Sequence, residues 1–271
     1  TIAIPGKSNI IFPHPTFALY PVYCKMFNLK FKTIGYNSNY QLNWKKIFEK
    51  IDNNTAIVFL PNPNIPIEGL LNLKEIEIIA KKCMKKKIIL VLDEVYYPYG
   101  NISGIKLVKK YSNIFIMRSF SKSFGLAGIR LGYLISSKKN IEYVSKTRTG
   151  YETNSLSITV ATFFIKNYKY IKNYIKDVKS GLKFLKKNLN KLDIENNGGE
   201  KSNFIFLNFK SKKLKNLIDQ ELKKKNIYVR SNWPKPYEGG FLVSGAPKKI
   251  MKKFLFNLKK IYNLKNKKVV K

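Results

Sequence analysis

The sequence predicts an α/β protein with parallel strands, in which a large first domain is followed by a smaller α+β domain. Over the first half of the chain, short runs rich in β-branched residues alternate with longer amphipathic stretches, as in parallel sheets whose strands are joined by helices. From about residue 154 the sequence becomes long, lysine-rich and helical, and a few strands and helices follow it. We therefore expect a large domain over residues 1–165 and a small domain over residues 166–271.

Each element of the first domain is predicted from a local pattern. The strands are short apolar runs, such as IILVLD at 88–93, and each is followed by a polar loop or one that contains Gly or Pro. The helices are the amphipathic stretches between these runs. In chain order we expect strands near 8–12, 29–34, 55–60, 88–93, 113–118 and 130–135, and helices near 16–27, 43–51, 73–86, 105–111 and 138–147.

The second domain is expected to begin with the long helical stretch that reaches about residue 190. Apolar runs then predict strands near 203–209, 226–230 and 240–244. Amphipathic sequence predicts a helix near 211–225 and a last one near 247–262.

The composition excludes several classes of protein. Hydrophobic residues make up 44% of the chain and aromatic residues 14%, which is enough for a core and argues against disorder. Two cysteines, Cys24 and Cys83, cannot form a disulfide framework, and a single histidine, His14, excludes a multi-histidine metal site. We therefore predict no metal. The apolar runs are too short to span a bilayer, so we expect a cytoplasmic protein with no membrane partner. The start at Thr1 suggests a partial sequence.

The charge is strongly positive, with 52 Lys and Arg against 16 Asp and Glu, a net +36. Such a charge attracts polyanions. Only four of the basic residues are arginine, however, and the lysines are spread along the chain instead of forming one stripe. Arginine supplies the planar fork that reads base edges and clamps carboxylates. We therefore interpret the lysines as a solvated surface and predict no specific nucleic-acid partner.

Residues suited to chemistry follow three of the predicted strands. The carboxyl ends of strands in open α/β sheets are where ligands bind. A desolvated lysine near other positive charge is a competent nucleophile, and hydroxyls grouped with a guanidinium can bind phosphate. A phosphorylated pyridine aldehyde could interact with all three groups, since its ring nitrogen suits an acid, its aldehyde a lysine, and its phosphate the hydroxyls and the guanidinium. The residues are Asp93 and Tyr96 after one strand, Ser119, Ser121, Lys122 and Arg130 after another, and Phe17 and Tyr20 after the first.

Three segments resemble the fold-type I, pyridoxal-phosphate-dependent aminotransferases of class I and II, and within them the histidinol-phosphate aminotransferase group. SFSKSFGLAGIRLGY at 119–133 is similar to the lysine motif of that group, LDEVYY at 92–97 to its DEAY motif, and HPTFALYPVY at 14–23 to its PPTY segment. The resemblance extends from Thr1 to about Gly245. It implies a mixed, mostly parallel sheet, pyridoxal 5'-phosphate as the cofactor, a role in amino-acid biosynthesis and a homodimer.

The resemblance also implies roles for individual residues. Lys122 would bond to the cofactor aldehyde and then shuttle a proton, while Asp93 would bind the ring nitrogen. Tyr96 would hydrogen-bond the phenolic oxygen of the ring. The remaining predicted contacts are Phe17 stacked on the ring, Ser119, Ser121 and Arg130 on the phosphate, Asn64 on the cofactor, and Arg230 and Tyr20 on the substrate, although Tyr20 could equally be a packing residue.

The sequence departs from the family pattern at three places. NPNIPIEG stands where the family has NPNNPTG, so Ile65 replaces a cofactor-binding asparagine, for which Asn62 or Asn64 could compensate. GGFLVSGAP lacks the expected carboxylate-binding arginine and has Phe241 or Leu242 there, depending on register. The glycine-rich segment that normally precedes this sequence and binds the phosphate is not in it, so we expect an N-terminally incomplete copy.

These observations predict an aminotransferase that acts on a small anionic amine or amino acid, similar to histidinol phosphate. Two alternatives stay open. One is a pyridoxal-phosphate-dependent decarboxylase of a phosphorylated amino acid, since Lys122, Asp93 and Arg130 would serve both reactions. The other is a non-catalytic paralogue that binds polyanions through its basic surface.

Overall fold

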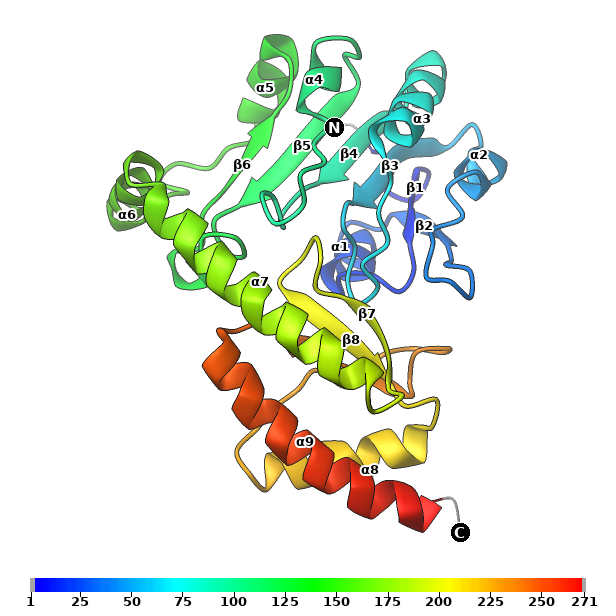
Figure 1. Ribbon diagram of the computed structural model, residues 1–271. Helices are drawn as coiled ribbons and strands as arrows, with labels where there is room; N and C mark the ends of the chain where they lie inside the picture. Colours follow the sequence, from blue (N-terminus) through cyan, green and yellow to red (C-terminus); the bar gives the residue numbers. More distant parts are fainter. Residues whose placement is uncertain (1–2, 270–271) are drawn as a thin grey trace. The chain divides into compact units, whose positions relative to one another are not determined.

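The computed structural model describes residues 3–269 and contains two compact units, the first ending at Tyr168 and the second beginning at Lys169 (Figure 1). Each unit has its own sheet. The first consists, in chain order, of β1 (Asn9–Pro13), α1 (Leu19–Met26), β2 (Lys30–Ile34), α2 (Lys46–Lys50), β3 (Thr55–Pro61), α3 (Leu73–Lys85), β4 (Ile89–Asp93), α4 (Ile105–Val108), β5 (Ile114–Ser119), the 3-10 helix η1 (Ala127–Ile129), β6 (Gly132–Ile135), α5 (Lys138–Ser145) and α6 (Ser155–Lys166).

The first sheet has six strands in the order β2-β1-β3-β4-β5-β6. All neighbouring pairs are parallel except β5 and β6, which are antiparallel. The prediction of a mixed, mostly parallel sheet is therefore confirmed. Because β1, β3, β4 and β5 run in one direction, the loops after them leave the sheet at the same edge.

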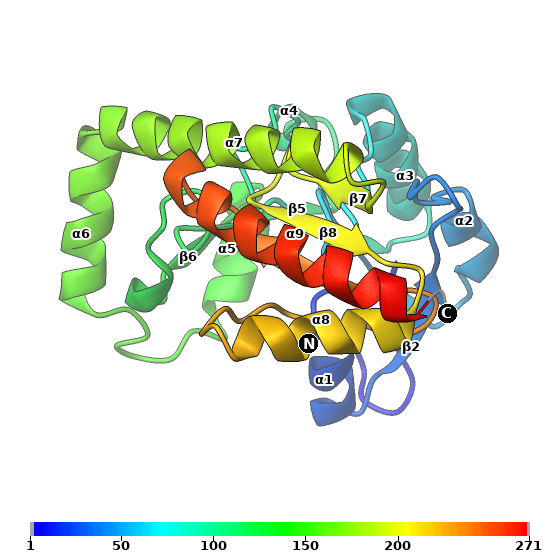
Figure 2. The same cartoon turned by 60° about the horizontal axis from the view of Figure 1, so that its bottom comes forward.

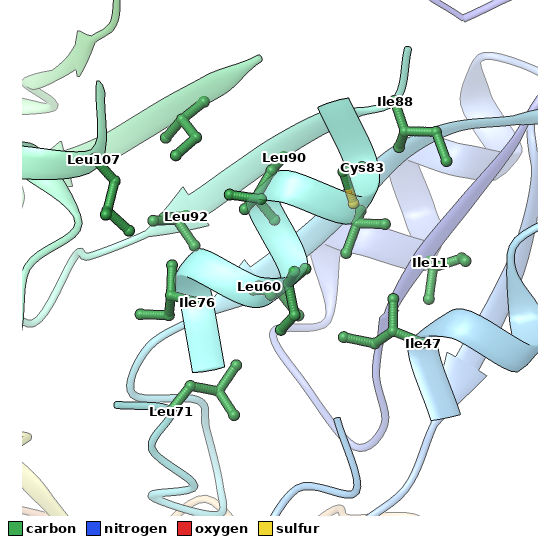
Figure 3. Packing of buried hydrophobic residues seen from close by; sticks show 14 of the residues in the cluster. Ile11, Ile47, Leu60, Leu71, Ile76, Cys83, Ile88, Leu90, Leu92 and Leu107 are labelled. Carbon is green, nitrogen blue, oxygen red and sulfur yellow. The ribbon is translucent and has the colours of Figure 1, made fainter. Parts of the chain in front are cut away.

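The two faces of this sheet are covered by different helices. One face packs against α2, α3 and α4 in a cluster of buried, mostly aliphatic side chains, several of which are labelled in Figure 3. Strand β4 contributes Leu90 and Leu92 to this cluster, and α3 contributes Ile76, Ile79 and Cys83. The opposite face packs against α1. Since side chains alternate along a strand, Asp93 points to the α1 face of the sheet.

The second unit consists of α7 (Lys169–Asn190), β7 (Glu195–Gly198), β8 (Phe204–Asn208), α8 (Lys212–Lys223), β9 (Gly240–Ser244) and α9 (Lys248–Val269). Its sheet is antiparallel in the order β7-β8-β9. Figure 2 shows α9 between α7 and α8, and α9 contacts both of them. This is a small α+β unit, as predicted.

The second unit differs from the prediction at two of its strands. Residues 226–230 were expected to form a strand, which is wrong: only Arg230 pairs with a strand, through an isolated antiparallel bridge to Leu242. Strand β7, with the sequence ENNG, was not predicted, because it has no apolar or β-branched residue. It forms by pairing with β8, whose side chains from Phe204 to Leu207 are buried.

Candidate active site

Asp93 is the last residue of β4 and is buried, with 6% of its surface exposed. Burial raises the pKa of its carboxyl group, and hydrogen bonds from the Tyr20 hydroxyl and the Val95 backbone N–H, together with the charge of Lys122, act in the opposite direction. The two hydrogen-bond donors at this carboxyl group, a phenol hydroxyl and a backbone N–H, are both neutral. The carboxyl group is therefore desolvated and held mainly by neutral donors, which is the environment in which a cationic ligand gains most.

Tyr20, on α1, lies against this carboxyl group. Its hydroxyl donates a hydrogen bond to Asp93 Oδ2, and its ring centroid lies 4.5 Å from that of Phe59 on β3. Burial, and then the charge of Asp93, raise the pKa of Tyr20 well above its ordinary value, so the hydroxyl stays protonated and remains a donor. The predicted stacking residue Phe17 forms a T-shaped pair with Tyr20, 5.9 Å between centroids, and is 40% exposed.

Lys122 and Tyr96 come from the loops after β5 and β4, and the structure brings them together. The Lys122 Nζ lies 5.9 Å from the centroid of the Tyr96 ring, and Tyr96 is buried. The fully buried Ser123 donates a hydrogen bond of 3.0 Å from its hydroxyl to the Tyr96 carbonyl, which ties the two loops together. The charge of Lys122 acts on the pKa of Asp93, so the amine, the phenol and the acid share one neighbourhood.

The predicted phosphate ligands lie along the turn between β5 and β6. The Ser121 backbone N–H donates to the Ser119 hydroxyl at 3.0 Å, so these two serines are adjacent in space as well as in sequence. Arg130 follows η1 in a left-handed conformation with φ 52°, is exposed, and donates from Nη1 to the Ala127 carbonyl at 3.0 Å. At Gly132 a Cβ would lie 2.9 Å from the Arg118 carbonyl oxygen, so this close approach of β6 to β5 requires glycine.

Asn64, in the loop after β3, has its amide engaged within the protein. Its Oδ1 accepts from the Thr16 hydroxyl at 2.7 Å, and its Nδ2 donates to the Pro15 carbonyl at 2.7 Å and to the Tyr36 hydroxyl at 2.5 Å. The side chain therefore joins the loops after β1 and β3. Ile65 beside it is buried, and its side chain cannot replace the amide of the family asparagine.

Sequence reasoning missed two features around this site. Tyr36 hydrogen-bonds Asn64, and its electrostatic interaction with Tyr20 places it in the same group of phenols. The second is a buried ion pair between Glu94 and Arg118, 2.9 Å from Nη2 to Oε2. The guanidinium also lies 3.6 Å from the centroid of the Tyr97 ring. The scarcity of arginine in the chain was the only signal that could have pointed to Arg118.

Glu94 is satisfied by several donors. Besides Arg118, its carboxylate accepts from the Ser103 hydroxyl at 2.9 Å and from the Gly104 backbone N–H at 2.7 Å. Glu94 directly follows Asp93, and Arg118 directly precedes Ser119. The ion pair therefore fixes the ends of β4 and β5 at the positions from which the site residues leave the sheet.

Arg230 belongs to the second unit. Its backbone N–H donates to the Leu242 carbonyl at 3.3 Å, and its carbonyl accepts from the Leu242 backbone N–H at 2.9 Å, so the two residues face each other in an antiparallel bridge. The guanidinium lies 4.6 Å from the centroid of Trp233. Phe241 and Leu242, which stand where a carboxylate-binding arginine was expected, are both buried.

The residues of the first unit fit the predicted cofactor in their chemistry. A buried carboxyl group with neutral hydrogen-bond donors suits a protonated pyridine nitrogen, an adjacent lysine suits an aldehyde, and two serines on one turn suit a phosphate ester. The described residues contain no group of three His, Cys, Asp or Glu that could hold a metal ion. Across the same part of the chain, every helix is too short or too polar to cross a membrane.

Comparisons with known proteins agree with this chemistry. The profile of the family described as aminotransferase class I and II matches residues 1–241. A histidinol-phosphate aminotransferase from Thermotoga neapolitana is 34% identical over 222 residues, which cover 82% of this chain and 63% of the relative. The chain thus spans less than two thirds of the length of that relative.

Two solved structures share the fold. The histidinol-phosphate aminotransferase from Clostridium acetobutylicum superimposes with a TM-score of 0.85 at 25% identity, covering 94% of this chain and 78% of that one. The histidinol-phosphate aminotransferase from Sinorhizobium meliloti, solved in complex with pyridoxal-5'-phosphate, gives a TM-score of 0.88 at 18% identity, covering 97% and 72%.

Proposed function

The chain belongs to the class I and II aminotransferase family, and on this premise we propose that it is a pyridoxal-phosphate-dependent aminotransferase acting on a small anionic amine or amino acid similar to histidinol phosphate. The observation that carries the proposal is the arrangement of Lys122, Tyr96 and the buried Asp93 at the ends of β4 and β5. The curated relative reported above favours amino transfer over decarboxylation and over a non-catalytic role.

We propose that Asp93 binds the pyridine nitrogen, Tyr96 the phenolic oxygen, and Ser119, Ser121 and Arg130 the phosphate. When bound, pyridoxal phosphate supplies an electron-withdrawing ring that stabilises negative charge on the substrate carbon. Asp93 is suited to its role because its burial excludes water, while Tyr20 and Val95 orient the carboxylate.

Lys122 is proposed as the catalytic residue that bonds to the cofactor and later moves a proton at its Nζ. An amine must lose its charge before it can act as nucleophile or base. The ring of the buried Tyr96 borders its site. The hydrogen bond from the Ser123 hydroxyl to the Tyr96 carbonyl holds the loop after β5, which carries Lys122, in this position.

Arg230 is proposed to bind the anionic group of the substrate. The strand position that lacks the family arginine is Leu242 or Phe241, and Leu242 is the direct bridge partner of Arg230. Side chains of directly opposed residues in an antiparallel pair share one face. Arg230 therefore stands next to the position at which the expected guanidinium would have been.

We also propose a homodimer and a cytoplasmic location. Helix α1 and the start of β2 expose a group of large apolar side chains, which on a protein surface is typical of an interface. Two unpaired buried thiols are usual in a reducing compartment. The exposed apolar residues are Leu19, Val22, Tyr23, Met26, Phe27 and Phe31.

Product analysis tests the proposed reaction. The chain loaded with pyridoxal phosphate would be incubated with histidinol phosphate and a 2-oxo acid, and separately with a phosphorylated amino acid, while new amino acid and released CO2 are measured. We expect amino transfer, reduced about 10²–10⁴-fold or more in Lys122→Ala. Release of CO2 without transfer, or RNA binding with no turnover, would replace this proposal with one of its alternatives.

A further inference from the structure

A pocket that is open to solvent, called the cavity below, lies entirely within the second unit, between the start of α8 and the segment 231–238. Its volume is about 460 Å³, within the range of small-molecule sites. None of its lining residues is among those assigned above to the cofactor or substrate. The lining includes Lys212, Lys215, Ser231, Trp233, Pro234 and Glu238.

Lys215 is the unusual residue of this cavity. Only 5% of its surface is exposed, although lysine is rarely buried without a partner. Its Nζ donates one hydrogen bond, of 3.2 Å, to the Ser231 carbonyl, whereas an ammonium has three donors. Burial lowers the pKa of Lys215. An anion would stabilise such a buried ammonium, because it would accept hydrogen bonds from the remaining N–H groups.

The nearby acid, Asp219, acts on this lysine through its charge, which favours the ammonium form. Asp219, one turn further along α8, accepts through Oδ2 from the Ser231 hydroxyl at 2.7 Å and from Lys223 Nζ at 3.1 Å. Among the described residues, Lys215 and Asp219 form no ion pair within 4.0 Å. Lys212, exposed on the same face one turn earlier, adds a second positive charge to the cavity.

Glu238 contributes the opposite charge. Its Oε2 is buried and has no hydrogen-bond partner in the described part of the chain. An unpartnered buried carboxylate oxygen costs free energy that a donor would recover. The lining thus combines a buried ammonium that has a single protein acceptor, the Ser231 carbonyl, with a carboxylate oxygen that has no donor among the described residues.

Trp233 gives the cavity an apolar wall of fixed orientation. Its indole N–H donates to the Arg230 carbonyl at 3.0 Å, and the Arg230 guanidinium lies over its ring. Pro234 continues this wall. Because the indole is held by these contacts, an apolar group of a ligand could pack on it with little ordering of the protein.

We propose that this cavity binds a free α-amino acid with an apolar side chain. The carboxylate accepts from Lys215 and Lys212, the ammonium donates to Glu238 Oε2, and the side chain packs on Trp233 and Pro234. Inorganic phosphate would leave Glu238 Oε2 unpartnered, and a simple amine would give Lys215 no acceptor beyond the Ser231 carbonyl. The proposal does not rest on the proposed function, since it uses no residue assigned to the cofactor or to catalysis.

The two tryptophans of the chain make a direct test possible. In a Trp44→Phe background, Trp233 is the single reporter, and the protein without cofactor is titrated while indole fluorescence is followed. The probes are L-phenylalanine, 3-phenylpropionate, 2-phenylethylamine and inorganic phosphate. We expect saturable binding of L-phenylalanine, with each single-charge probe weaker by about tenfold or more. Equal binding of 3-phenylpropionate or phosphate, or no saturable signal, would overturn the proposal.

Matched variants separate the site from general damage. Lys215→Met should weaken L-phenylalanine binding by about tenfold or more, and Lys213→Met, an exposed lysine of the same helix, should leave it unchanged. In Glu238→Gln, the affinity for L-phenylalanine should fall close to the affinity for 3-phenylpropionate. Misfolding would not give this result, so the variant also tests the proposal if Lys215→Met fails to fold. Equal loss in Lys215→Met and Lys213→Met would contradict the assignment. Lys122→Ala should retain the change in Trp233 fluorescence on binding of L-phenylalanine. Failure of the amino-acid site and failure of the catalytic proposal are therefore distinguishable.

Discussion

The hydroxyl of Tyr20 donates a hydrogen bond to the carboxylate of Asp93 across 73 residues of sequence. This bond joins α1 to the end of β4 on the face of the sheet opposite the aliphatic core. It also opposes the effect of burial on the pKa of Asp93, since it favours the charged form. Tyr20 is thereby a positioning residue for the acid that we propose to hold the cofactor ring.

Removal of this hydroxyl should raise the pKa of Asp93. In Tyr20→Phe the buried carboxylate loses its side-chain donor, and a hydrogen bond to a charged group is worth about 1.5–3 kcal/mol. The carboxyl resonance of Asp93, followed by NMR against pH, should therefore titrate about one unit higher or more. Tyr23→Phe is the matched control, because Tyr23 lies on the same helix and is 49% exposed. An unchanged titration in Tyr20→Phe would show that the bond does not stabilise the charged acid.

Replacement of Asp93 by asparagine should stabilise the protein at neutral pH. The pKa of Asp93 is raised in the folded state, so the folded chain holds its proton to higher pH than the unfolded chain does. The carboxyl group therefore lowers the free energy of unfolding as pH rises from the ordinary aspartate range through the folded pKa. Asp93→Asn keeps an acceptor for Tyr20 and has no charge to bury. In denaturation of the cofactor-free protein, Asp93→Asn should increase the free energy of unfolding at neutral pH, and this increase should disappear at low pH. An increase that does not depend on pH would contradict this reasoning.

Loss of Arg118 should destabilise the first unit strongly. Arg118→Met leaves Glu94 as an unpaired buried charge, which typically costs about 3–5 kcal/mol. Part of that loss should be recovered in the double variant Glu94→Gln, Arg118→Met. The exposed pair of Arg148 and Glu152 provides the control, since Arg148→Met should change the free energy of unfolding by only about 0–1 kcal/mol. Equal effects at the two arginines, measured by urea denaturation, would show that burial of the pair is unimportant.

An arginine at position 242 should improve the use of α-amino-acid donors. Leu242 is the bridge partner of Arg230, so Leu242→Arg places a second guanidinium beside the first. Loss of one partner of a buried, hydrogen-bonded charge pair typically costs about 2–5 kcal/mol. We expect kcat/KM for carboxylate donors to rise at least tenfold, with less effect on amines that lack the carboxylate. Phe241→Arg is the control, because Phe241 is fully buried and neighbouring side chains of a strand point to opposite faces. Unchanged donor kinetics in Leu242→Arg would refute the argument from the missing arginine.

The sheet of the first unit was predictable because its strands carry their own signal. Apolar runs such as 88–93 are buried on both faces of a parallel sheet, and such runs are visible in the sequence without knowledge of their partners. Strand β7 carries no such signal, since ENNG becomes a strand only by pairing with β8. Residues 226–230 show the converse case, in which an apolar run with good strand propensity is paired at Arg230 alone.

The candidate site was predictable in its residue types and much less in its contacts. Asp93, Tyr96 and Lys122 were predicted to lie together because strand ends in a parallel sheet meet at one edge, and the structure brings them together. The ion pair of Glu94 with Arg118 depends on which side chains face each other after folding. The hydrogen bond from Asn64 to Tyr36 likewise depends on how two loops pack. The sequence has no pattern that indicates which residues form either of these two contacts.

The site of covalent attachment of pyridoxal phosphate tests the central proposal most directly. The chain would be incubated with pyridoxal phosphate, reduced with borohydride, digested and examined by mass spectrometry. We predict a visible absorption band that reduction removes, and a phosphopyridoxyl group on the peptide that contains Lys122. The band should be absent in Lys122→Ala and retained in Lys106→Ala, which removes an exposed lysine. Labelling spread over the surface lysines with no preference for Lys122 would contradict the account.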